Sequence, residues 1–183
     1  MITLTTKQKI GLGVLGGGVL ISAAILFAFR SPLSPYSGLH NDLKTIEPPV
    51  ELSYTDLDGN PVKFSDFRGE PLIINSWATW MPFSKEELQA LMKLKESKGD
   101  QLTVRAINRM EDRAVIRGYL ATYGIDTAKI LFLVDPGDTF YKGVGGYAMP
   151  ETVFYARDGA IMTHTRGVLV EAELVRSAEA LLK

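Results

Sequence analysis

The longest apolar stretch of the chain runs from Ile10 to Phe29, interrupted only by glycines and Ser22. A helix of this length rises roughly 30 Å, the thickness of the hydrocarbon core of a bilayer. No small-x-small cleavage site follows the stretch, which favours an uncleaved anchor over a removed signal peptide. Lys7 and Lys9 precede it and Arg30 follows, so the charge balance places the N-terminus in the cytoplasm and the rest of the chain on the far side.

The anchor divides the chain into four parts. Residues 1–9 form a short cytoplasmic N-terminus, 10–29 the transmembrane anchor, 30–48 a linker that contains prolines and glycine, and 49–183 a single domain. Gly13 and Gly17 form a G-x-x-x-G pair, which gives a weak indication that two anchors pack together.

From residue 50 onward, short apolar or alternating runs are separated by turn residues and by helical patterns. Asp58-Gly59-Asn60 predicts the turn of an N-terminal hairpin. Alternation of strands and helices, closed by a second hairpin and a helix, predicts an α/β fold with helices on both faces of a sheet. The predicted strands cover 50–54, 62–64, 72–77, 102–107, 130–134, 151–155 and 160–166, and the predicted helices cover 82–98, 111–123, 139–142 and 170–182.

The stretch from Pro71 to Leu94 is the most informative part of this pattern. An apolar strand is followed by Trp-Ala-Thr-Trp and then by a helix whose buried stripe is Leu88, Leu91 and Leu94. Proline near the first turn and acidic residues behind it suit a helix N-terminus. A capping box between Ser84 and Glu87 is an alternative that starts the helix slightly later. The helix at 111–123 is expected to bury one face, formed by Val115, Ile116, Tyr119, Leu120 and Tyr123.

Composition narrows the chemistry. The net charge is −1 and the lysines and arginines are scattered, so no basic stripe points to nucleic acid. The chain has no cysteine, which excludes a disulfide, a thiolate metal site and a thiol nucleophile. Its two histidines, His40 and His164, lie far apart in sequence and are expected to be ordinary surface residues. No cofactor is expected.

The string W-A-T-W-M-P-F-S-K-E-E after an apolar strand resembles the active-site segment of the TlpA/ResA-like (redoxin) proteins, a membrane-anchored thioredoxin-fold family. The hairpin followed by S-D-F-R-G, and the later A-M-P-E-T-V-F-Y-A-R-D-G, resemble the same family. The resemblance implies a thioredoxin-like fold, with a central mixed sheet flanked by helices. It also implies that the bond before Pro150 is cis and that this proline lies beside the active-site segment.

Both reactive positions of that family are altered here. The resemblance places its nucleophilic cysteine at Met81 and its resolving cysteine at Ser84. A thioether neither ionises nor exchanges disulfides, and a serine hydroxyl needs an adjacent base to act as a nucleophile. The family often carries an acid in the region of Glu111 for proton transfer, but a plain helix-start carboxylate is preferred here.

The degenerate active-site positions suggest a binding surface. Methionine-rich apolar surfaces suit adaptable binding, whereas the alternative is that these side chains only fill space. Two thioethers, Met81 and Met149, with His164, form a less favoured site for a soft metal such as Cu(I). The degenerate positions are Trp80, Met81, Pro82, Phe83 and Ser84, followed by Met149 and Pro150 of the cis-proline loop, and the candidate partner-binding patch is Trp80, Met81, Phe83, Tyr147 and Met149.

Three functions therefore remain open. The first is a membrane-anchored, non-catalytic module that binds a protein partner or supports an assembly. The second is a thiol-disulfide oxidoreductase of the redoxin type, as the family implies, although the residues supply no thiol. The third is a copper carrier. The sequence favours the first, with the domain on the non-cytoplasmic side of the membrane.

Overall fold

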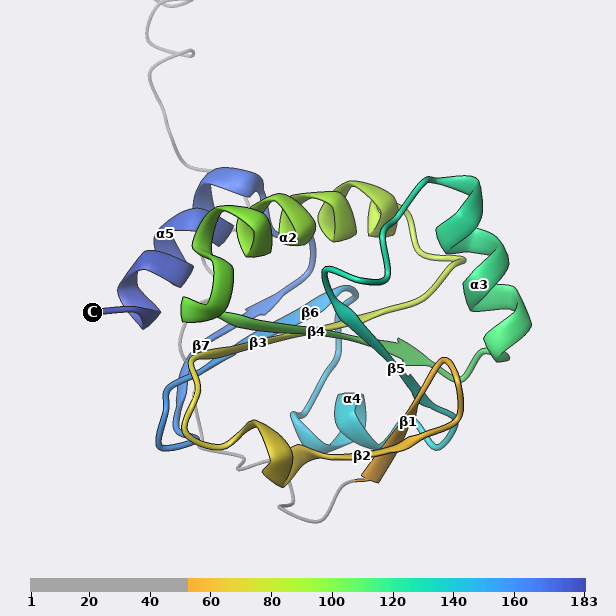
Figure 1. Ribbon diagram of the computed structural model, residues 1–183, viewed down its shortest axis with the longest axis horizontal. Helices are drawn as coiled ribbons and strands as arrows, with labels where there is room; N and C mark the ends of the chain where they lie inside the picture. The colour runs from red at the N-terminus through yellow and green to blue at the C-terminus, as the bar shows by residue number, and fades with distance from the viewer. Residues whose placement is uncertain (1–52) are drawn as a thin grey trace, which may run out of the picture. The chain divides into compact units, whose positions relative to one another are not determined.

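A seven-stranded mixed sheet forms the centre of the part of the chain that the computed structural model describes, residues 53–183 (Figure 1). The strand order is β2-β1-β5-β4-β3-β6-β7. Strands β3, β4 and β5 are parallel, whereas β6 and β1 pair with this central group in the antiparallel sense. The predicted mixed sheet with an N-terminal hairpin is confirmed.

The helices and strands follow the predicted order with small shifts at their ends. The strands are β1 (Ser53–Asp56), β2 (Pro61–Lys63), β3 (Leu72–Trp77), β4 (Thr103–Arg109), β5 (Leu131–Asp135), β6 (Glu151–Tyr155) and β7 (Ile161–Arg166). The α-helices are α2 (Ser84–Lys98), α3 (Arg113–Thr122), α4 (Thr139–Gly143) and α5 (Glu171–Leu181), and two 3-10 turns are η1 (Phe64–Phe67) and η2 (Gly99–Gln101).

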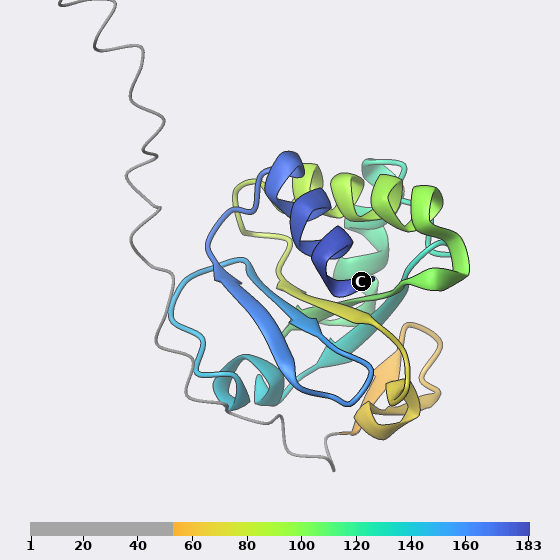
Figure 2. The ribbon, with the colours of Figure 1, turned by 90° about the vertical axis from the view of Figure 1, so that its left-hand side faces the viewer.

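Helices cover the two faces of the sheet unequally. Figures 1 and 2 show α2, α3 and α5 on one face, with α4 and η1 on the other. The first face holds the larger apolar core, in which Trp77, Leu88 and Leu91 have no exposed surface. The second face holds a smaller core that includes Ile74 and Phe140. Burial of apolar side chains on both faces of the sheet supplies the main stabilisation of the domain.

Two details of the predicted pattern are wrong. Phe64 leaves the hairpin and starts η1, so its ring packs in the smaller core against Tyr155. On α3, Ile116 and Leu120 are buried, but Val115 is 50% exposed and Tyr123 41% exposed. Ile116 and Leu120, four residues apart, lie on the side of α3 that faces the sheet. Val115, one position before Ile116, therefore lies on the outer side.

The predicted anchor at 10–29, like the linker, lies outside the described residues. Within residues 53–183, no helix combines the length and apolar character that a membrane crossing requires.

Candidate functional site

The segment that joins β3 to α2 occupies the end of the sheet where the parallel strands terminate. Phe83 lies in the left-handed region with φ 72° and serves as the N-cap of α2 without a side-chain hydrogen bond. The helix therefore begins at Ser84, and Pro82 precedes it rather than lying in its first turn. A non-glycine residue in this region of the backbone is uncommon and marks a constrained connection.

Ser84 closes this connection from inside. Its hydroxyl donates a hydrogen bond to the carbonyl oxygen of Ala78 at 2.9 Å, and only 1% of the residue is exposed. The same carbonyl accepts a hydrogen bond from the backbone N–H of Met81 at 3.2 Å. Ser84 is thus a buried structural hydroxyl, and the alternative that paired it with Glu87 in a capping box is wrong.

Glu87 lies on the inner side of α2, with 4% of its surface exposed. Its Oε1 accepts hydrogen bonds from Asn75 Nδ2 at 3.1 Å and from Thr152 Oγ1 at 2.9 Å. Burial raises the pKa of Glu87 from 4.5 to about 8, and the hydrogen bond from Thr152 offsets this in part. The side chain is therefore a largely neutral acid at pH 7, held between β3, α2 and β6 beneath the altered active-site positions. The sequence missed this role, because an acid in a first helical turn is ordinarily exposed.

Glu111 binds the β3–α2 connection instead of starting a helix. Its carboxylate accepts the backbone N–H of Thr79 at 2.7 Å, the Thr79 hydroxyl at 2.5 Å and Asn108 Nδ2 at 2.7 Å. Helix α3 begins two residues later, at Arg113. The preferred interpretation of Glu111 as a helix-start carboxylate is wrong, since its function is to tie the connection after β3 to the end of β4.

The loop before β6 carries the second part of the site. The peptide bond between Met149 and Pro150 is cis, as the resemblance implies. Ser76 pairs with Glu151 in the β3–β6 register, so the β3–α2 connection leaves β3 at the same end of the sheet where this loop enters β6.

Glu151 fixes this loop from below. Its Oε1 accepts the backbone N–H groups of Tyr147 at 2.9 Å and Ala148 at 3.2 Å, and its Oε2 lies 2.5 Å from Nε2 of His164. Arg166 Nε lies 3.8 Å from the same oxygen. All of Glu151 is buried, and His164 is only 8% exposed, so the expectation that His164 is a surface residue is wrong.

The candidate patch combines exposed and half-buried side chains. Trp80 is 62% exposed, Phe83 57% and Tyr147 60%, while Met81 and Met149 are half-buried. Large apolar side chains that are open to solvent in a group mark binding surfaces more often than isolated ones do. Pro82 is exposed and Pro150 is buried.

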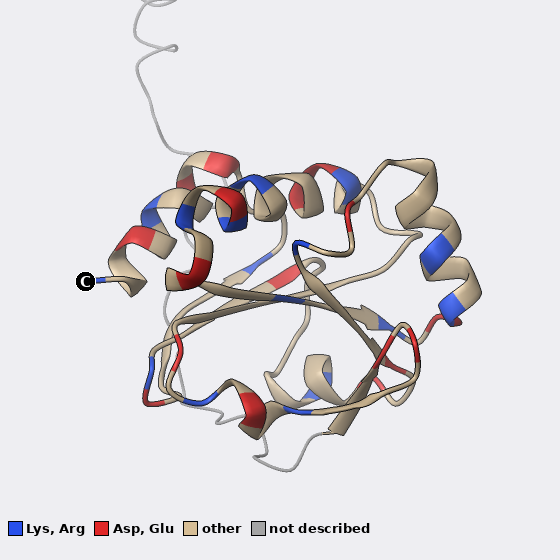
Figure 3. Ribbon diagram, viewed as in Figure 1, with Lys and Arg blue, Asp and Glu red and all other residues tan. Residues whose placement is uncertain are grey.

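Sequence reasoning missed two further exposed apolar residues at this end of the sheet. Met110 follows β4 with φ 58° and is 64% exposed, and Val168 follows β7 and is 47% exposed. Both residues lie just after a strand, outside any periodic apolar pattern, so the sequence gives no sign of their exposure. Within residues 53–183, no cluster of three or more histidine, aspartate and glutamate side chains is arranged to hold a metal ion. Charges of both signs lie on α2 and α5, whereas α3 carries only basic residues (Figure 3).

Comparison with known proteins decides the family. The Redoxin family model matches residues 43–182. The chain belongs to the Redoxin family. This redoxin is 32% identical over 122 residues to the thiol:disulfide interchange protein DsbE of Pseudomonas fluorescens, covering 64% of this chain and 66% of the relative. It is 24% identical over 151 residues to the thiol-disulfide oxidoreductase ResA of Halalkalibacterium halodurans, covering 81% and 82%.

Solved structures agree with the fold. A thioredoxin family protein of Chlorobium tepidum, a thiol:disulfide interchange protein, superposes with a TM-score of 0.63 at 20% identity and covers 78% of this redoxin and all of its own chain. A secreted disulfide oxidoreductase of Mycobacterium tuberculosis gives 0.63 at 21% identity, with 72% and 97% covered. The thioredoxin-like fold of this redoxin is therefore established, whereas the relatives' thiol chemistry has no cysteine here to carry it.

Proposed function

We propose that this redoxin is a non-catalytic, membrane-anchored module that binds a protein partner through the surface around Met81. The proposal rests on the different exposure of Ser84 and of the aromatic residues around the altered positions. Ser84 is turned inward and bonded to Ala78, while the aromatic side chains of Trp80 and Phe83 stay exposed beside it. A vestigial site under no constraint gives no reason to keep large aromatic groups in water.

The anchor at 10–29 and a domain on the non-cytoplasmic side belong to the same proposal. They rest on the apolar stretch and on the lysines before it. Protease added to intact spheroplasts is expected to digest the domain. Protection in spheroplasts, followed by digestion after lysis, would reverse this orientation.

A site-specific photo-crosslinker tests the binding surface in the full-length protein. Placed at Trp80 or Tyr147 in native membranes, it is expected to give a discrete set of cross-linked proteins. Val115 is a matched control position, since it is half exposed on α3. Met81→Asp should reduce the adducts from Tyr147, because a carboxylate in an apolar contact must be desolvated. Adducts of equal yield and identity from Val115, or adducts unchanged by Met81→Asp, would refute the proposal.

The family's thiol-disulfide oxidoreductase activity is the alternative that the relatives' names suggest. It would require a route without a thiol, since Cys is absent from all 183 residues. Turnover of insulin disulfides by the full-length protein with dithiothreitol, above the rate with dithiothreitol alone, would support this alternative over a binding module. The copper carrier rests on residue types alone, since nothing in the described residues brings Met81, Met149 and His164 together around one point.

A further inference from the structure

The two edges of the sheet differ in how they are protected from pairing with another strand. At one edge, β2 is only three residues long and contains Pro61 and Lys63. Short length, proline and lysine are the devices that keep edge strands from pairing with other chains. At the other edge, β7 has six residues, Ile161–Arg166, without proline or lysine. Its register irregularity lies at its start, opposite Phe154 and Tyr155, and its one arginine lies at its end, so the middle of the strand carries neither device.

Backbone hydrogen bonding shows which groups of β7 face outward. Gly167 N–H donates to the carbonyl of Pro150 at 2.8 Å, and Arg166 pairs with Glu151 in the register. In an antiparallel pair, residues that exchange hydrogen bonds alternate with residues that do not. Arg166 and His164 therefore direct their backbone N–H and C=O groups away from β6, toward the edge where the described residues supply no neighbouring strand.

We infer that β7 is a docking edge for β7 of a second copy of this chain, which joins two sheets across a two-fold axis. A continuous sheet with closed two-fold symmetry requires the two strands to be antiparallel. Pairing His164 of each copy with Arg166 of the other uses the outward N–H and C=O groups of both residues in each strand, and it places Thr165 opposite itself on the axis.

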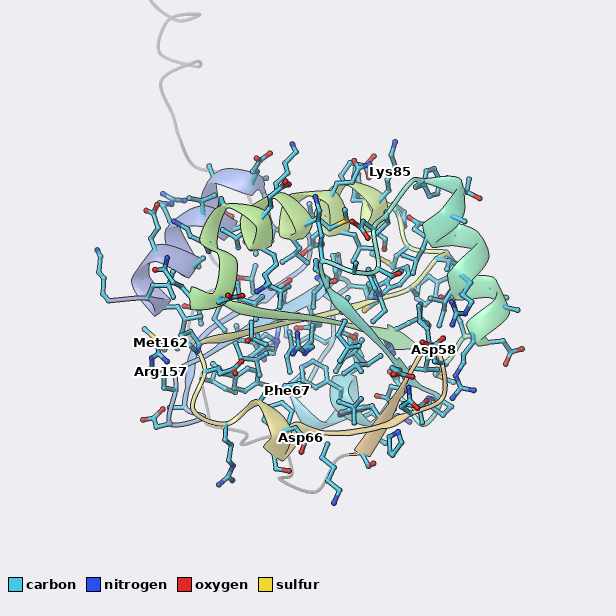
Figure 4. All side chains as sticks on the ribbon, viewed as in Figure 1. Asp58, Asp66, Phe67, Lys85, Arg157 and Met162 are labelled. Carbon is cyan, nitrogen blue, oxygen red and sulfur yellow. The ribbon has the colours of Figure 1, made fainter. Side chains whose placement is uncertain are left out.

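The side chains of β7 fit this arrangement. Arg166 is the only lysine, arginine, aspartate or glutamate of β7, and it lies at the end of the strand. Antiparallel pairing puts the two arginines on opposite sides of the axis, so that like charges do not face each other. Threonine opposite threonine is a favourable cross-strand pair. Met162, which is 45% exposed, adds an apolar side chain near the rim, where Figure 4 labels it. Figure 2 shows β7 as the outermost blue strand of the sheet.

A disulfide scan of the full-length protein tests the register, because each introduced cysteine is the only thiol of the chain. Directly opposite residues that exchange no hydrogen bonds have Cα atoms about 4.5 Å apart, which a disulfide spans. Thr165→Cys should therefore give a disulfide-linked dimer when diamide takes two electrons and two protons from the paired thiols. Thr163→Cys should give several-fold less, since residue 163 of one copy faces residue 167 of the other, about four residues along the strand from its own counterpart.

Three controls make the scan decisive. Val115→Cys, on the exposed side of α3, measures collisional cross-linking. Adding Thr163→Lys to Thr165→Cys gives β7 the charge that Lys63 gives β2 and should abolish the dimer, whereas adding Val115→Lys should not. Thermal melts establish that each variant is folded. Equal cross-linking at 163 and 165, or a dimer that survives Thr163→Lys, would overturn the two-fold pairing. Association through the anchors alone gives no preference for position 165, so it is distinguished by the same data.

Discussion

Ser84 and Ala78 are joined by a hydrogen bond from the serine hydroxyl to the alanine carbonyl oxygen, across the connection between β3 and α2. This bond gives Ser84, the second altered position, a structural role. It is built into the backbone turn that presents Trp80 and Met81, and the hydroxyl has no access to a substrate, since the residue is 1% exposed.

The first prediction concerns the thiol chemistry that the scaffold can still support. Met81→Cys with Ser84→Cys is expected to fold and to form a reversible disulfide, because the strand, the helix start and cis-Pro150 are retained. The helix N-terminus should lower the pKa of the thiol at position 81 below its ordinary value. Titration of thiolate absorbance against pH measures this. The single variant Met81→Cys is the matched control, and a double variant that melts far below the wild type would contradict the expectation.

The second prediction concerns Glu87 and pH. Its pKa is raised from 4.5 to about 8 in the folded protein, so the folded state binds a proton that the unfolded state releases between these values. The free energy of unfolding should therefore be greatest below about pH 4.5 with respect to this group and fall as pH rises to about 8, by at most about 1.4 kcal/mol per unit.

Glu87→Gln isolates this effect. Its amide oxygen can accept the hydrogen bonds from Asn75 and Thr152, but the side chain does not titrate. Urea denaturation at pH 5 and pH 8 is expected to show the variant gaining stability relative to the wild type as pH rises. Parallel curves for the two proteins across this range would mean that Glu87 ionises in the folded state as it does in water.

The third prediction concerns Glu111. Glu111→Ala leaves the N–H of Thr79 and the amide of Asn108 without their acceptor, which costs about 1–3 kcal/mol. Hydrogen exchange should accelerate at the Thr79 amide more than at amides of the core strands. Glu86→Ala, which removes an exposed acid from the first turn of α2, serves as the control and should cost less. Unchanged exchange at Thr79 would show that the connection after β3 is held by other contacts.

The fourth prediction concerns Gly146, which packs against the ring of Tyr141. A Cβ added at this position would lie 2.5 Å from the ring, and the guanidinium of Arg109 also stacks on that ring, 3.4 Å from its centroid. Gly146→Ala should destabilise the domain by about 1–3 kcal/mol and disturb the loop that carries Tyr147.

Gly118 on α3 provides the matched control for this substitution. No atom lies within 4 Å of a Cβ built there, so Gly118→Ala should stabilise the domain by about 0.5–1 kcal/mol through helix propensity. Equal melting temperatures for the two variants would show that Tyr141 moves aside without cost.

Apolar periodicity, turn residues and the leucine stripe of α2 depend on neighbours in the chain, so they sufficed to predict the order and type of the strands and helices. The motif around Met81 and the segment before β6 also sufficed to predict the thioredoxin-like fold and the cis bond at Pro150. The absence of cysteine excluded thiol chemistry without any coordinates.

The contacts of the polar residues could not be predicted in this way. Glu87, Glu111 and Glu151 all lie at helix starts or strand ends. Each carboxyl group nevertheless forms a hydrogen bond with another segment: Glu87 with Asn75, Glu111 with Thr79 and Glu151 with His164. The open edge of β7 was equally hidden, since which backbone groups face outward depends on pairing with β6. Hydrogen-bond partners and strand neighbours are distant in sequence, and no local pattern of apolar and polar positions records which segments meet.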